Sequence, residues 1–553
     1  MTRAAGAPGA PRIRRREADA GPRDPIRHIL PLGVAVFVSA VAGVLQTLAF
    51  PTLSWWPVVF VSVPLALIAL TGRRAWSAVL VGFANGLGFY LINVAFTSRY
   101  LGPVPWLALS IVEALLTAAM AVPIALAYRW LPRVMPGRWG RLVALPAVVA
   151  GLWVAREELI GHEPYGGFPW GRLGVTQVDS PLGHLISWVG MTGVGFLIVF
   201  FCATAVEYLR IGTWRDLRTA LPGAVTIVVL LLVPQFPTTP AGTLRVGAVQ
   251  GDGPTGYFDK RTDYAVIDAQ VAATEPLLGH RMDLLAWPEG GVDYDPTQDA
   301  PTAAILDGIQ QRSGATLLAN AAVRKGANDY NLSFVWQAGH GITQSYAKWH
   351  PVPFGEYVPD RWLFEPLAPE LIGLIGRGYT PGTTAPVVTV KGVGVGLAIC
   401  FDVIYDDVIR TGARDGARLF VFQTNNADFR GTDENIQQLA FARARALETG
   451  RSVVNISTVG RSQVIAPDGS ELDGIPAGTA GHLLADVPLR TGLTPAILAG
   501  GWIDGILGWG SVAALAAAGV FMRRRRGPHA TTPAPAGTGV DWTDALRRSG
   551  APS

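Results

Sequence analysis

Long apolar stretches constrain this chain more than any other feature of its 553 residues. A bilayer core about 30 Å thick is crossed by about 20 largely apolar residues in a helix. Eight stretches have this character: 29–49, 53–71, 76–96, 105–128, 142–158, 185–207, 219–236 and 497–521. Buried strands rarely exceed about ten residues, so these stretches do not suit a soluble core. The sequence therefore predicts a multi-pass α-helical membrane domain with eight transmembrane helices.

The composition agrees with a chain that is partly solvated by lipid. Half of the residues are hydrophobic and only 16% are charged, which is not typical of a soluble globular protein. The formal net charge is +4, but the arginines cluster at the ends of the apolar stretches and form no patch with interleaved aromatic residues. We therefore expect no nucleic-acid partner.

The arginines also predict the orientation of the helices, because basic loops stay in the cytoplasm. With the N-terminus inside, the short outer loops contain only Arg99, Arg156 and Arg172. The inner segments contain Arg12, Arg14, Arg15, Arg16, Arg23, Arg27, Arg73, Arg74, Arg129, Arg133, Arg138, Arg141, Arg210, Arg215, Arg218 and Arg523 to Arg526. A signal peptide is the alternative for the N-terminus, but its first apolar run exceeds the usual h-region of about 7–15 residues. We interpret that run as an uncleaved first helix.

This topology divides the chain into five segments: a basic cytoplasmic N-terminus (1–28), a seven-helix transmembrane domain (29–236), an extracytoplasmic domain (237–496), an eighth transmembrane helix (497–522) and a cytoplasmic tail (523–553). The tail is rich in Pro, Ala, Thr and Gly, so we expect it to be disordered. The two cysteines of the chain, Cys202 and Cys400, give no disulfide framework.

The extracytoplasmic segment alternates strand and helix patterns. Short runs rich in Val, Leu and Ile, bounded by Gly, Pro, Asn or Asp, predict strands at 244–250, 283–287, 315–320, 332–337, 385–390, 395–400, 418–423 and 453–457. Helical spacing of apolar residues predicts helices at 261–279 and 434–450. Strands alternating with helices favour a layered α/β domain.

Three reactive side chains follow or precede predicted strands. Glu289 lies in WPEGG, Lys348 precedes the proline-containing loop HPVPFGEY, and Cys400 ends LAIC. Taken singly, each has an ordinary explanation as a turn glutamate, an exposed lysine or an inert buried thiol. Together they form a chemical set, because a nucleophilic thiol needs a base to take its proton and a cation to stabilise the developing anion.

The motifs WPE, K followed by PFGEY, and CFD occur in the order found in the carbon-nitrogen hydrolase (nitrilase) superfamily, and the segment resembles that superfamily. Because helices precede and follow it, the chain as a whole resembles the apolipoprotein N-acyltransferase family over about residues 29–522. Further matching motifs are GGFPWGRLG (166–174), VQG (249–251) and RARALETGRSVVNISTVGRS (443–462). The resemblance implies a nitrilase-like αββα sandwich outside the membrane.

The resemblance also implies roles for individual residues. Glu289 would be the general base, Lys348 the partner of the oxyanion and Cys400 the nucleophile, with Glu356 as a second essential glutamate that holds Lys348. Further candidates for supporting residues are Phe401, Asp402 and Asn425. The chain has Phe401 and Asp402 where the family often has Tyr-Glu, and Asn425 opens NNADF where the family has an Asn-Asp-Ala-Trp-Phe run. Tyr257 or Phe258 would stand in for a tryptophan of the family that contacts substrate.

The implied reaction is ping-pong acyl transfer in the bacterial cytoplasmic membrane. Cys400 would take an acyl chain from a phospholipid as a thioester, and the α-amine of a diacylglyceryl-cysteine in an apolipoprotein would then accept it, the last step of lipoprotein maturation. The implied enzyme uses no cofactor and acts as a monomer. No metal site is expected, because His162 and His350 have no partners at metal-ligand spacing.

The segment 361–379 (RWLFEPLAPELIGLIGRGY) lies between Lys348 and Cys400 and is rich in apolar residues. We expect it to form a lid that contacts lipid, with Trp362, Phe364, Leu371 and Ile375 as candidate contacts. A core helix of the domain is an equally suitable interpretation of this pattern.

Two other classes of protein remain open. A membrane-anchored amidase or nitrilase would use the same Glu-Lys-Cys set but pass the acyl group to water. A transporter with a non-catalytic outer domain would not need Cys400. Seven helices before the polar segment are more than a simple hydrolase needs as an anchor, which favours the acyltransferase.

Overall fold

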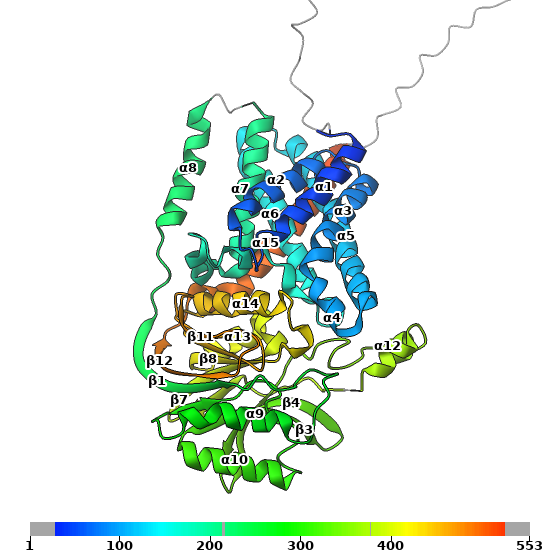
Figure 1. The fold of residues 1–553 in the computed structure, drawn as a ribbon. Helices are drawn as coiled ribbons and strands as arrows, with labels where there is room; N and C mark the ends of the chain where they lie inside the picture. The colour runs from blue at the N-terminus through cyan, green and yellow to red at the C-terminus, as the bar shows by residue number, and fades with distance from the viewer. Residues whose placement is uncertain (1–27, 213–215, 377, 526–553) are drawn as a thin grey trace, which may run out of the picture.

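The computed structural model describes residues 28–212, 216–376 and 378–525. A helical bundle forms one end of the molecule and an α/β domain (residues 237–494) the other (Figure 1). The predictions for Arg12 to Arg27, Arg215 and nearly all of the tail lie outside the described residues.

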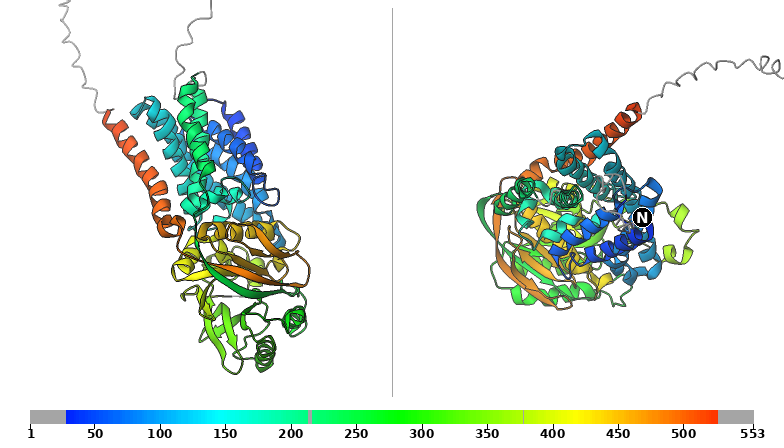
Figure 2. Two further views of the ribbon diagram at one scale, coloured as in Figure 1. Left: turned by 90° about the vertical axis from the view of Figure 1, so that its left-hand side faces the viewer. Right: turned by 90° about the horizontal axis from the view of Figure 1, so that it is seen from above.

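Each predicted apolar stretch contains a helix. The long helices of the bundle are α1 (Leu32–Thr47), α2 (Val59–Leu70), α3 (Ala75–Asn93), α5 (Pro103–Val134), α6 (Leu145–Ile160), α7 (Ile186–Arg210), α8 (Leu217–Leu232) and α15 (Pro495–Arg525). A short helix, α4 (Ser98–Leu101), lies where α3 leads into α5. The described chain enters α1 and leaves α15 at the end of the bundle opposite the α/β domain (Figures 1 and 2).

The prediction of eight transmembrane helices is confirmed only in part. Among the described residues, four helical segments are long and apolar enough to cross a membrane: Ala75–Asn93, Pro103–Val134, Gly183–Arg210 and Pro495–Arg524. Helix α1 has 16 residues, which rise about 24 Å. It is shorter than the apolar stretch 29–49, in part because Ala49 is buried in the turn that follows the helix. Apolar residues in turns therefore lengthen the pattern without lengthening the helix.

The α/β domain contains two six-stranded sheets. In the first, the strand order is β12 (Gly481–Thr491), β1 (Thr239–Gln250), β2 (Leu284–Ala286), β3 (Thr316–Lys325), β4 (Asn328–Gln337) and β5 (Gly341–Ala347). In the second it is β11 (Glu471–Ile475), β10 (Ser462–Ile465), β9 (Val453–Ser457), β8 (Ala417–Thr424), β7 (Val393–Ile399) and β6 (Val387–Val390). The central strands β1–β2–β3 and β7–β8–β9 run parallel, and the outer strands are antiparallel.

Helices cover the outer face of each sheet, so the predicted layered α/β domain is confirmed as an αββα sandwich (Figure 1). Helices α9 (Ala265–Thr274) and α10 (Ala300–Ser313) cover the first sheet, on the side away from the bundle. Helices α13 (Asp406–Arg414) and α14 (Glu434–Thr449) cover the second sheet, and α14 packs on α7. Residues 419–422 of β8 are completely buried, as expected for a parallel strand covered on both faces.

A cluster of buried ion pairs joins the α/β domain to the bundle, and we call it the interface cluster. Asp406 of α13 accepts from Arg172 at 2.8 Å and from Arg445 of α14 at 2.6 Å. Arg410 pairs with Asp406 at 3.2 Å and with Asp504 of α15 at 2.6 Å. Buried opposite charges at these distances fix the height and rotation of the domain on the bundle.

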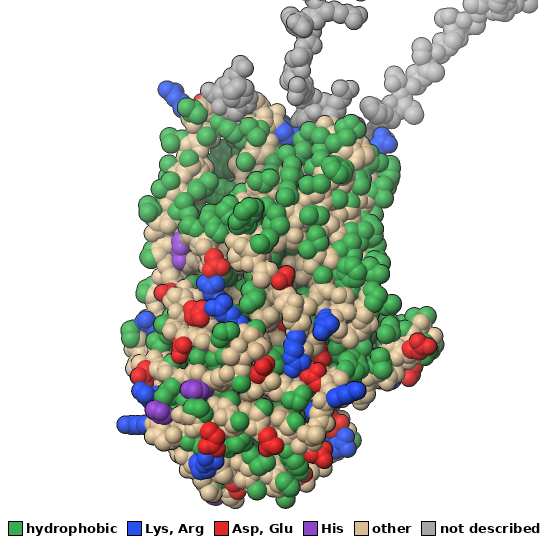
Figure 3. Space-filling view, viewed as in Figure 1, with side chains coloured by type: hydrophobic (Ala, Val, Ile, Leu, Met, Phe, Trp, Pro, Cys, Tyr) green, Lys and Arg blue, Asp and Glu red, His purple; other side chains and the backbone are tan. Residues whose placement is uncertain are grey.

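The two ends of the molecule have different surfaces. Apolar side chains cover the bundle, whereas charged side chains gather on the α/β domain (Figure 3). Two short helices, α11 (Arg361–Phe364) and α12 (Pro369–Leu374), lie where these surfaces meet. Seen along the bundle, the segment that contains α12 projects beyond its outline (Figure 2). It is therefore not the core helix that was the alternative prediction for residues 361–379.

Candidate active site

Loops at the ends of three strands bring Glu289, Lys348 and Cys400 together. Glu289 lies three residues after β2, and the backbone of Gly290 donates to Asn320 Oδ1 at 2.7 Å. Lys348 follows β5 and Cys400 follows β7. Cys400 has a φ of 49°, a left-handed conformation that non-glycine residues rarely adopt. A sharp turn of this kind places the sulfur at the end of the strand.

The Lys348 ammonium is buried beside two carboxylates. Its side chain is 1% exposed, and its Nζ lies 2.8 Å from Glu356 Oε2 and 3.5 Å from Glu289 Oε1. Burial alone lowers the pKa of Lys348, but the charges of Glu356 and Glu289 outweigh burial and hold this pKa well above its ordinary value. The lysine is therefore a fixed positive charge.

Asn331 of β4 holds both glutamates. Its Nδ2 donates to Glu289 Oε1 at 2.7 Å and to Glu356 Oε1 at 2.9 Å, while its Oδ1 accepts from Asn320 at 2.9 Å. The Val352 amide donates to the other oxygen of Glu356 at 2.7 Å. Burial raises the pKa of Glu356, but Lys348 and these hydrogen bonds together lower it by more than burial raises it. The net shift is downward. Glu356 remains a carboxylate that is fully occupied by donors.

Glu289 differs from Glu356 because one of its oxygens is open. Glu289 Oε2 is buried and accepts no hydrogen bond from the nitrogen and oxygen donors of the described residues, and the Cys400 thiol is the donor that interacts with this carboxyl group. Burial raises the pKa of Glu289 more strongly than Lys348 lowers it. A buried carboxylate with a raised pKa and a free oxygen can accept a proton at that oxygen. We call Glu289, Glu356, Lys348 and Cys400 the acid–lysine–cysteine cluster.

Cys400 is half-buried and electrostatically coupled to the other members of the cluster. Burial and the charge of Glu289 raise the pKa of Cys400 well above its ordinary value, and Lys348 acts in the opposite direction. The resting sulfur is therefore a neutral thiol. Gln438 Nε2 of α14 lies 3.4 Å from its Sγ.

The two residues after Cys400 connect the cluster to its surroundings. Asp402 Oδ2 accepts from Tyr346 at 2.7 Å, and its Oδ1 accepts from the His350 amide at 3.0 Å, so it ties the turn of Cys400 to the lysine loop. Burial raises the pKa of Asp402. The ring of Phe401 stacks on Phe168 from the GGFPW segment, with centroids 5.7 Å apart.

Three other predicted site residues lie beside the cluster and not in it. Asn425 Oδ1 accepts from Thr255 at 3.2 Å and from Thr458 at 2.9 Å, so it holds two loops together. Tyr257 packs against Phe258 and both pack against Tyr100, the third residue of α4. The Tyr257 hydroxyl donates to the Leu374 carbonyl at 3.0 Å and so anchors the segment predicted to be a lid.

The lid segment (residues 361–379, with Arg377 outside the described residues) exposes apolar side chains, but not all of those expected. Trp362 is 76% exposed and Leu367 is 74% exposed. Phe364 and Leu371 are half-buried. Ile375 is 1% exposed, so its prediction as a surface contact is wrong. The segment bends after α12 and turns Ile375 inward, which a helical pattern could not predict.

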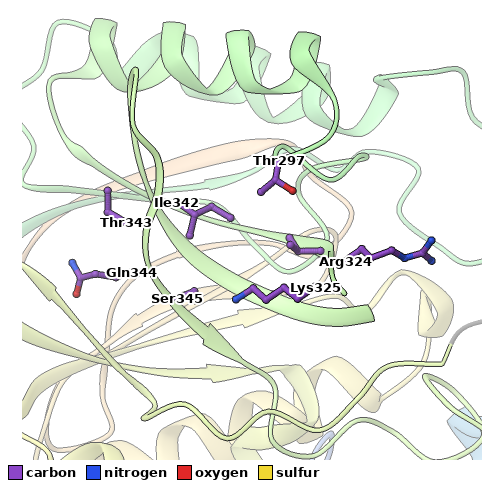
Figure 4. A pocket seen from close by; sticks show the side chains of 8 residues that line it. Thr297, Arg324, Lys325, Ile342, Thr343, Gln344 and Ser345 are labelled. Carbon is purple, nitrogen blue, oxygen red and sulfur yellow. The ribbon is translucent and has the colours of Figure 1, made fainter. Parts of the chain in front are cut away.

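An open hollow of about 410 Å³ lies on the α/β domain away from the acid–lysine–cysteine cluster (Figure 4). It is lined by residues of β3, β5 and their neighbours, including Arg324 and Lys325. It contains no pair of groups suited to acyl transfer. Within the described ranges, no group of three or more His, Cys, Asp or Glu is arranged to hold a metal ion. His350 instead pairs with Asp407 at 3.0 Å.

Sequence reasoning missed several polar residues of the site. Asn320, Asn331, Asn426, Glu434 and Gln438 are all buried. For Asn320, the available signal was an asparagine inside the otherwise apolar run TLLANAAV of β3, since a buried amide needs partners.

Comparison with known proteins gives two matches to family models that together span both ends of the molecule. Residues 42–204 match the apolipoprotein N-acyltransferase N-terminal domain. Residues 245–493 match the carbon-nitrogen hydrolase domain. A solved amidase of the nitrilase superfamily from Nesterenkonia AN1 is 19% identical and covers 46% of this chain and 94% of its own, with a TM-score of 0.34. That likeness is too weak to support an argument about this chain.

Whole-length relatives are more informative. The apolipoprotein N-acyltransferase of Mycolicibacterium smegmatis is 31% identical over 515 residues, which are 86% of this chain and 83% of the relative. The apolipoprotein N-acyltransferase of Ralstonia nicotianae is 31% identical over 543 residues, which are 94% of this chain and 98% of the relative. The apolipoprotein N-acyltransferase of Vibrio cholerae is 26% identical over 516 residues, which are 88% of this chain and 97% of the relative. The similarity therefore extends across the bundle and the α/β domain, and the chain belongs to the apolipoprotein N-acyltransferase family of membrane acyltransferases.

Proposed function

We propose that this enzyme transfers an acyl chain from a membrane phospholipid to the N-terminal α-amine of diacylglyceryl-cysteine in apolipoproteins, through a thioester on Cys400. The observation that carries the proposal is the open oxygen of Glu289, buried beside the fixed ammonium of Lys348 and the half-buried sulfur of Cys400. All of these groups come from one chain, so a monomer is sufficient for the chemistry.

In the first half-reaction, Cys400 Sγ attacks the ester carbonyl carbon while Glu289 Oε2 takes the thiol proton. Lys348 Nζ stabilises the oxyanion that forms. The ester C–O bond then breaks, and Glu289 returns the proton to the departing alcohol oxygen. The products are a lysophospholipid and an acyl thioester on Cys400.

In the second half-reaction, the neutral α-amine of the acceptor attacks the thioester carbonyl and loses a proton to Glu289. The C–S bond breaks, and the sulfur regains that proton as a thiol. The product carries a third acyl chain on an amide nitrogen. Because burial keeps the thiol of Cys400 neutral at rest, proton removal accompanies attack in each cycle.

The membrane surroundings suit lipid substrates on both sides of the reaction. Each acyl methylene costs about 0.8 kcal/mol to move from lipid to water, so the site has to meet its substrates at the bilayer surface. The stacking of the α/β domain on the apolar bundle supports such a site. We place the α/β domain outside the cytoplasmic membrane, because Arg73, Arg74, Arg133 and Arg138 lie at inner ends of the helices under that orientation.

We also propose that the lid segment contacts lipid through Trp362 and Leu367. Both side chains are mostly exposed, and the segment projects at the level where the apolar and charged surfaces meet. Exposed large apolar residues in such a position suit a membrane interface. Tyr257 would hold one end of the segment near the site.

The test uses the full-length protein in phospholipid vesicles with an acyl-labelled phospholipid and a diacylglyceryl-cysteine peptide. We expect equal amounts of lysophospholipid and N-acylated peptide, and labelled Cys400 when the peptide is left out. Cys400→Ser should abolish both products, whereas Cys202→Ser, which changes the buried thiol of α7, serves as the matched control. Normal peptide acylation by Cys400→Ser would contradict the proposal.

The same experiment separates the enzyme from a hydrolase. The acid–lysine–cysteine cluster would also serve a membrane-anchored amidase if water took the acyl group from Cys400. Labelled free fatty acid in place of N-acylated peptide would identify that activity. A wild-type protein that forms no acylated Cys400 would exclude both.

A further inference from the structure

The sulfur of Cys400 has a polar neighbour that does not belong to the first sheet. Glu289, Glu356 and Lys348 all come from loops of the first sheet, whereas Gln438 comes from α14 on the opposite side of the second sheet. Gln438 is buried, and its Nε2 lies 3.4 Å from Cys400 Sγ. A primary amide N–H at this distance donates a hydrogen bond to sulfur.

Asn426 fixes the orientation of the Gln438 amide. Asn426 Nδ2 donates to Gln438 Oε1 at 2.9 Å, which leaves the Gln438 nitrogen as the atom that faces the sulfur. Asn426 Oδ1 accepts from Ser457 Oγ at 2.6 Å. The side-chain oxygens of Gln438 and Asn426 are therefore each identified by the donor that they accept from, and this fixes the direction in which each NH₂ group points.

Glu434 is the last member of this hydrogen-bonded series, and at neutral pH it adds no second negative charge beside Cys400. Asn426 Nδ2 also donates to Glu434 Oε2 at 2.8 Å. Burial raises the pKa of Glu434 to about 8, although its hydrogen bond to Asn426 opposes the shift. The titratable groups that act on Cys400 are Glu289, Lys348 and Glu434, and Gln438 is the donor among its neighbours that does not titrate.

We propose that Gln438 is a further catalytic residue, whose Nε2–H donates to Cys400 Sγ and stabilises the sulfur whenever it carries negative charge, with Asn426 as the positioning residue that aims this donor. Negative charge reaches the sulfur twice: as the thiol proton leaves, and again as the C–S bond of the thioester breaks. The role in turnover rests on the acyl transfer proposed above, but the effect on the sulfur itself does not.

A matched pair of neighbouring glutamines allows a sharp test. Gln437 and Gln438 are consecutive residues of α14 and both are buried. Gln437 Oε1 accepts from Trp170 of the bundle at 2.6 Å, whereas Gln438 contacts Cys400. Methionine has a similar length and adapts to irregular surroundings, so Gln438→Met and Gln437→Met remove one amide each with little change of shape.

The measurement is the rate at which iodoacetamide alkylates Cys400 in the full-length detergent-solubilised protein between pH 6 and pH 10, followed by mass spectrometry of the Cys400 peptide. Loss of a hydrogen bond to a charged group should make Gln438→Met about tenfold slower at neutral pH. That change shifts the pH profile upward by about one unit. Asn426→Ala should shift it in the same direction, and Gln437→Met should match the wild type.

Four results decide whether Gln438 has this role. Profiles of Gln438→Met and Gln438→Leu that superimpose on the wild type would overturn the proposal, as would an equal shift in Gln437→Met. In vesicles, Gln438→Met should lower kcat about tenfold and leave KM unchanged. If the alkylation shift occurs but the wild type transfers no acyl chain, the proposed function fails while the role of Gln438 at the sulfur stands.

Discussion

The acid–lysine–cysteine cluster and the interface cluster are both buried, but they balance their charges differently. In the first, one ammonium faces two carboxylates, and Glu289 Oε2 has no nitrogen or oxygen donor from the described residues. In the second, Asp406 faces three arginines, and both of its oxygens accept charged hydrogen bonds or ion pairs. The two glutamates of the first cluster share one cation, whereas Asp406 has three cations beside it, which also pair with Glu158, Glu448 and Asp504.

The difference appears in the proton affinities of the two acids. Burial raises the pKa of Glu289 because Lys348 only partly compensates for it. The three arginines outweigh burial at Asp406 and hold its pKa well below the ordinary value. An acid that exchanges protons during a reaction needs incomplete compensation, whereas an acid that joins two parts of a molecule needs complete compensation.

The largest expected effect comes from removing the open carboxylate. Glu289→Gln keeps the shape and the hydrogen bond from Asn331 but cannot take the thiol proton. We expect acyl transfer in vesicles to fall by about 10³–10⁴-fold, since loss of a positioned base has effects of this order. Thermal unfolding should stay close to that of the wild type. A residual rate within tenfold of the wild type would remove Glu289 from the role of base.

The second effect is on stability. Asp406→Asn leaves Arg172, Arg410 and Arg445 buried without their common carboxylate, which should cost about 3–5 kcal/mol of unfolding free energy. The matched control is Asp179→Asn, which removes a part-exposed pair with Arg443 at 2.7 Å and should cost less than about 1 kcal/mol. Denaturant titration followed by tryptophan fluorescence measures both. Equal losses would mean that burial does not distinguish the two pairs.

The third effect is a difference in pH dependence between the clusters. The raised pKa of Glu289 means that kcat/KM should rise with pH, about tenfold per unit, until that pKa is passed. The lowered pKa of Asp406 contributes stability that is complete above the unfolded aspartate value of about 3.9 and is lost only as pH falls toward the folded value. Parallel measurements of kcat/KM and thermal unfolding should therefore show activity lost at a higher pH than structure. Coincident losses would contradict the comparison.

The smallest effect concerns the lid segment. Trp362→Ser combined with Leu367→Ser removes apolar area that would contact lipid, and it should raise KM for phospholipid about fivefold with kcat unchanged. Leu472→Ser, an exposed leucine of β11, provides the control. Kinetics in vesicles of varied phospholipid content measures the change. If both variants behave alike, the lid segment has no special contact with lipid.

Much of the α/β domain follows from the sequence, because its central strands are buried on both faces and read as continuous apolar runs. The eight predicted strands all occur, and residues 434–450 form α14 almost as expected. The missed elements are β5, β10, β11, β12, α10 and α13. β5, β11 and β12 lie at sheet edges, and polar residues interrupt the apolar pattern in the buried strand β10 and in the helices α10 and α13.

The residues of the candidate active site could be predicted from the sequence only where they lie in a recognisable motif. WPE, PFGEY and CFD identify residues that the structure brings together, although their roles remain proposals. Gln438 and Asn331 carry no such mark, because each acts through contacts with residues distant in the sequence. The pairing of Arg410 with Asp504 at 2.6 Å is also invisible to local patterns, since 94 residues separate them. Long-range pairs of this kind depend on the completed fold.

The contact of Asp402 with Tyr346 and His350 has a mechanical consequence. Cys400 follows a strand of the second sheet and Lys348 follows a strand of the first. Any sliding of one sheet over the other would therefore change the distance between the sulfur and the ammonium. Asp402 joins the two sheets beside these groups, because it accepts hydrogen bonds from Tyr346 and from the backbone of His350. These bonds oppose such sliding and help to keep the spacing of sulfur and ammonium constant.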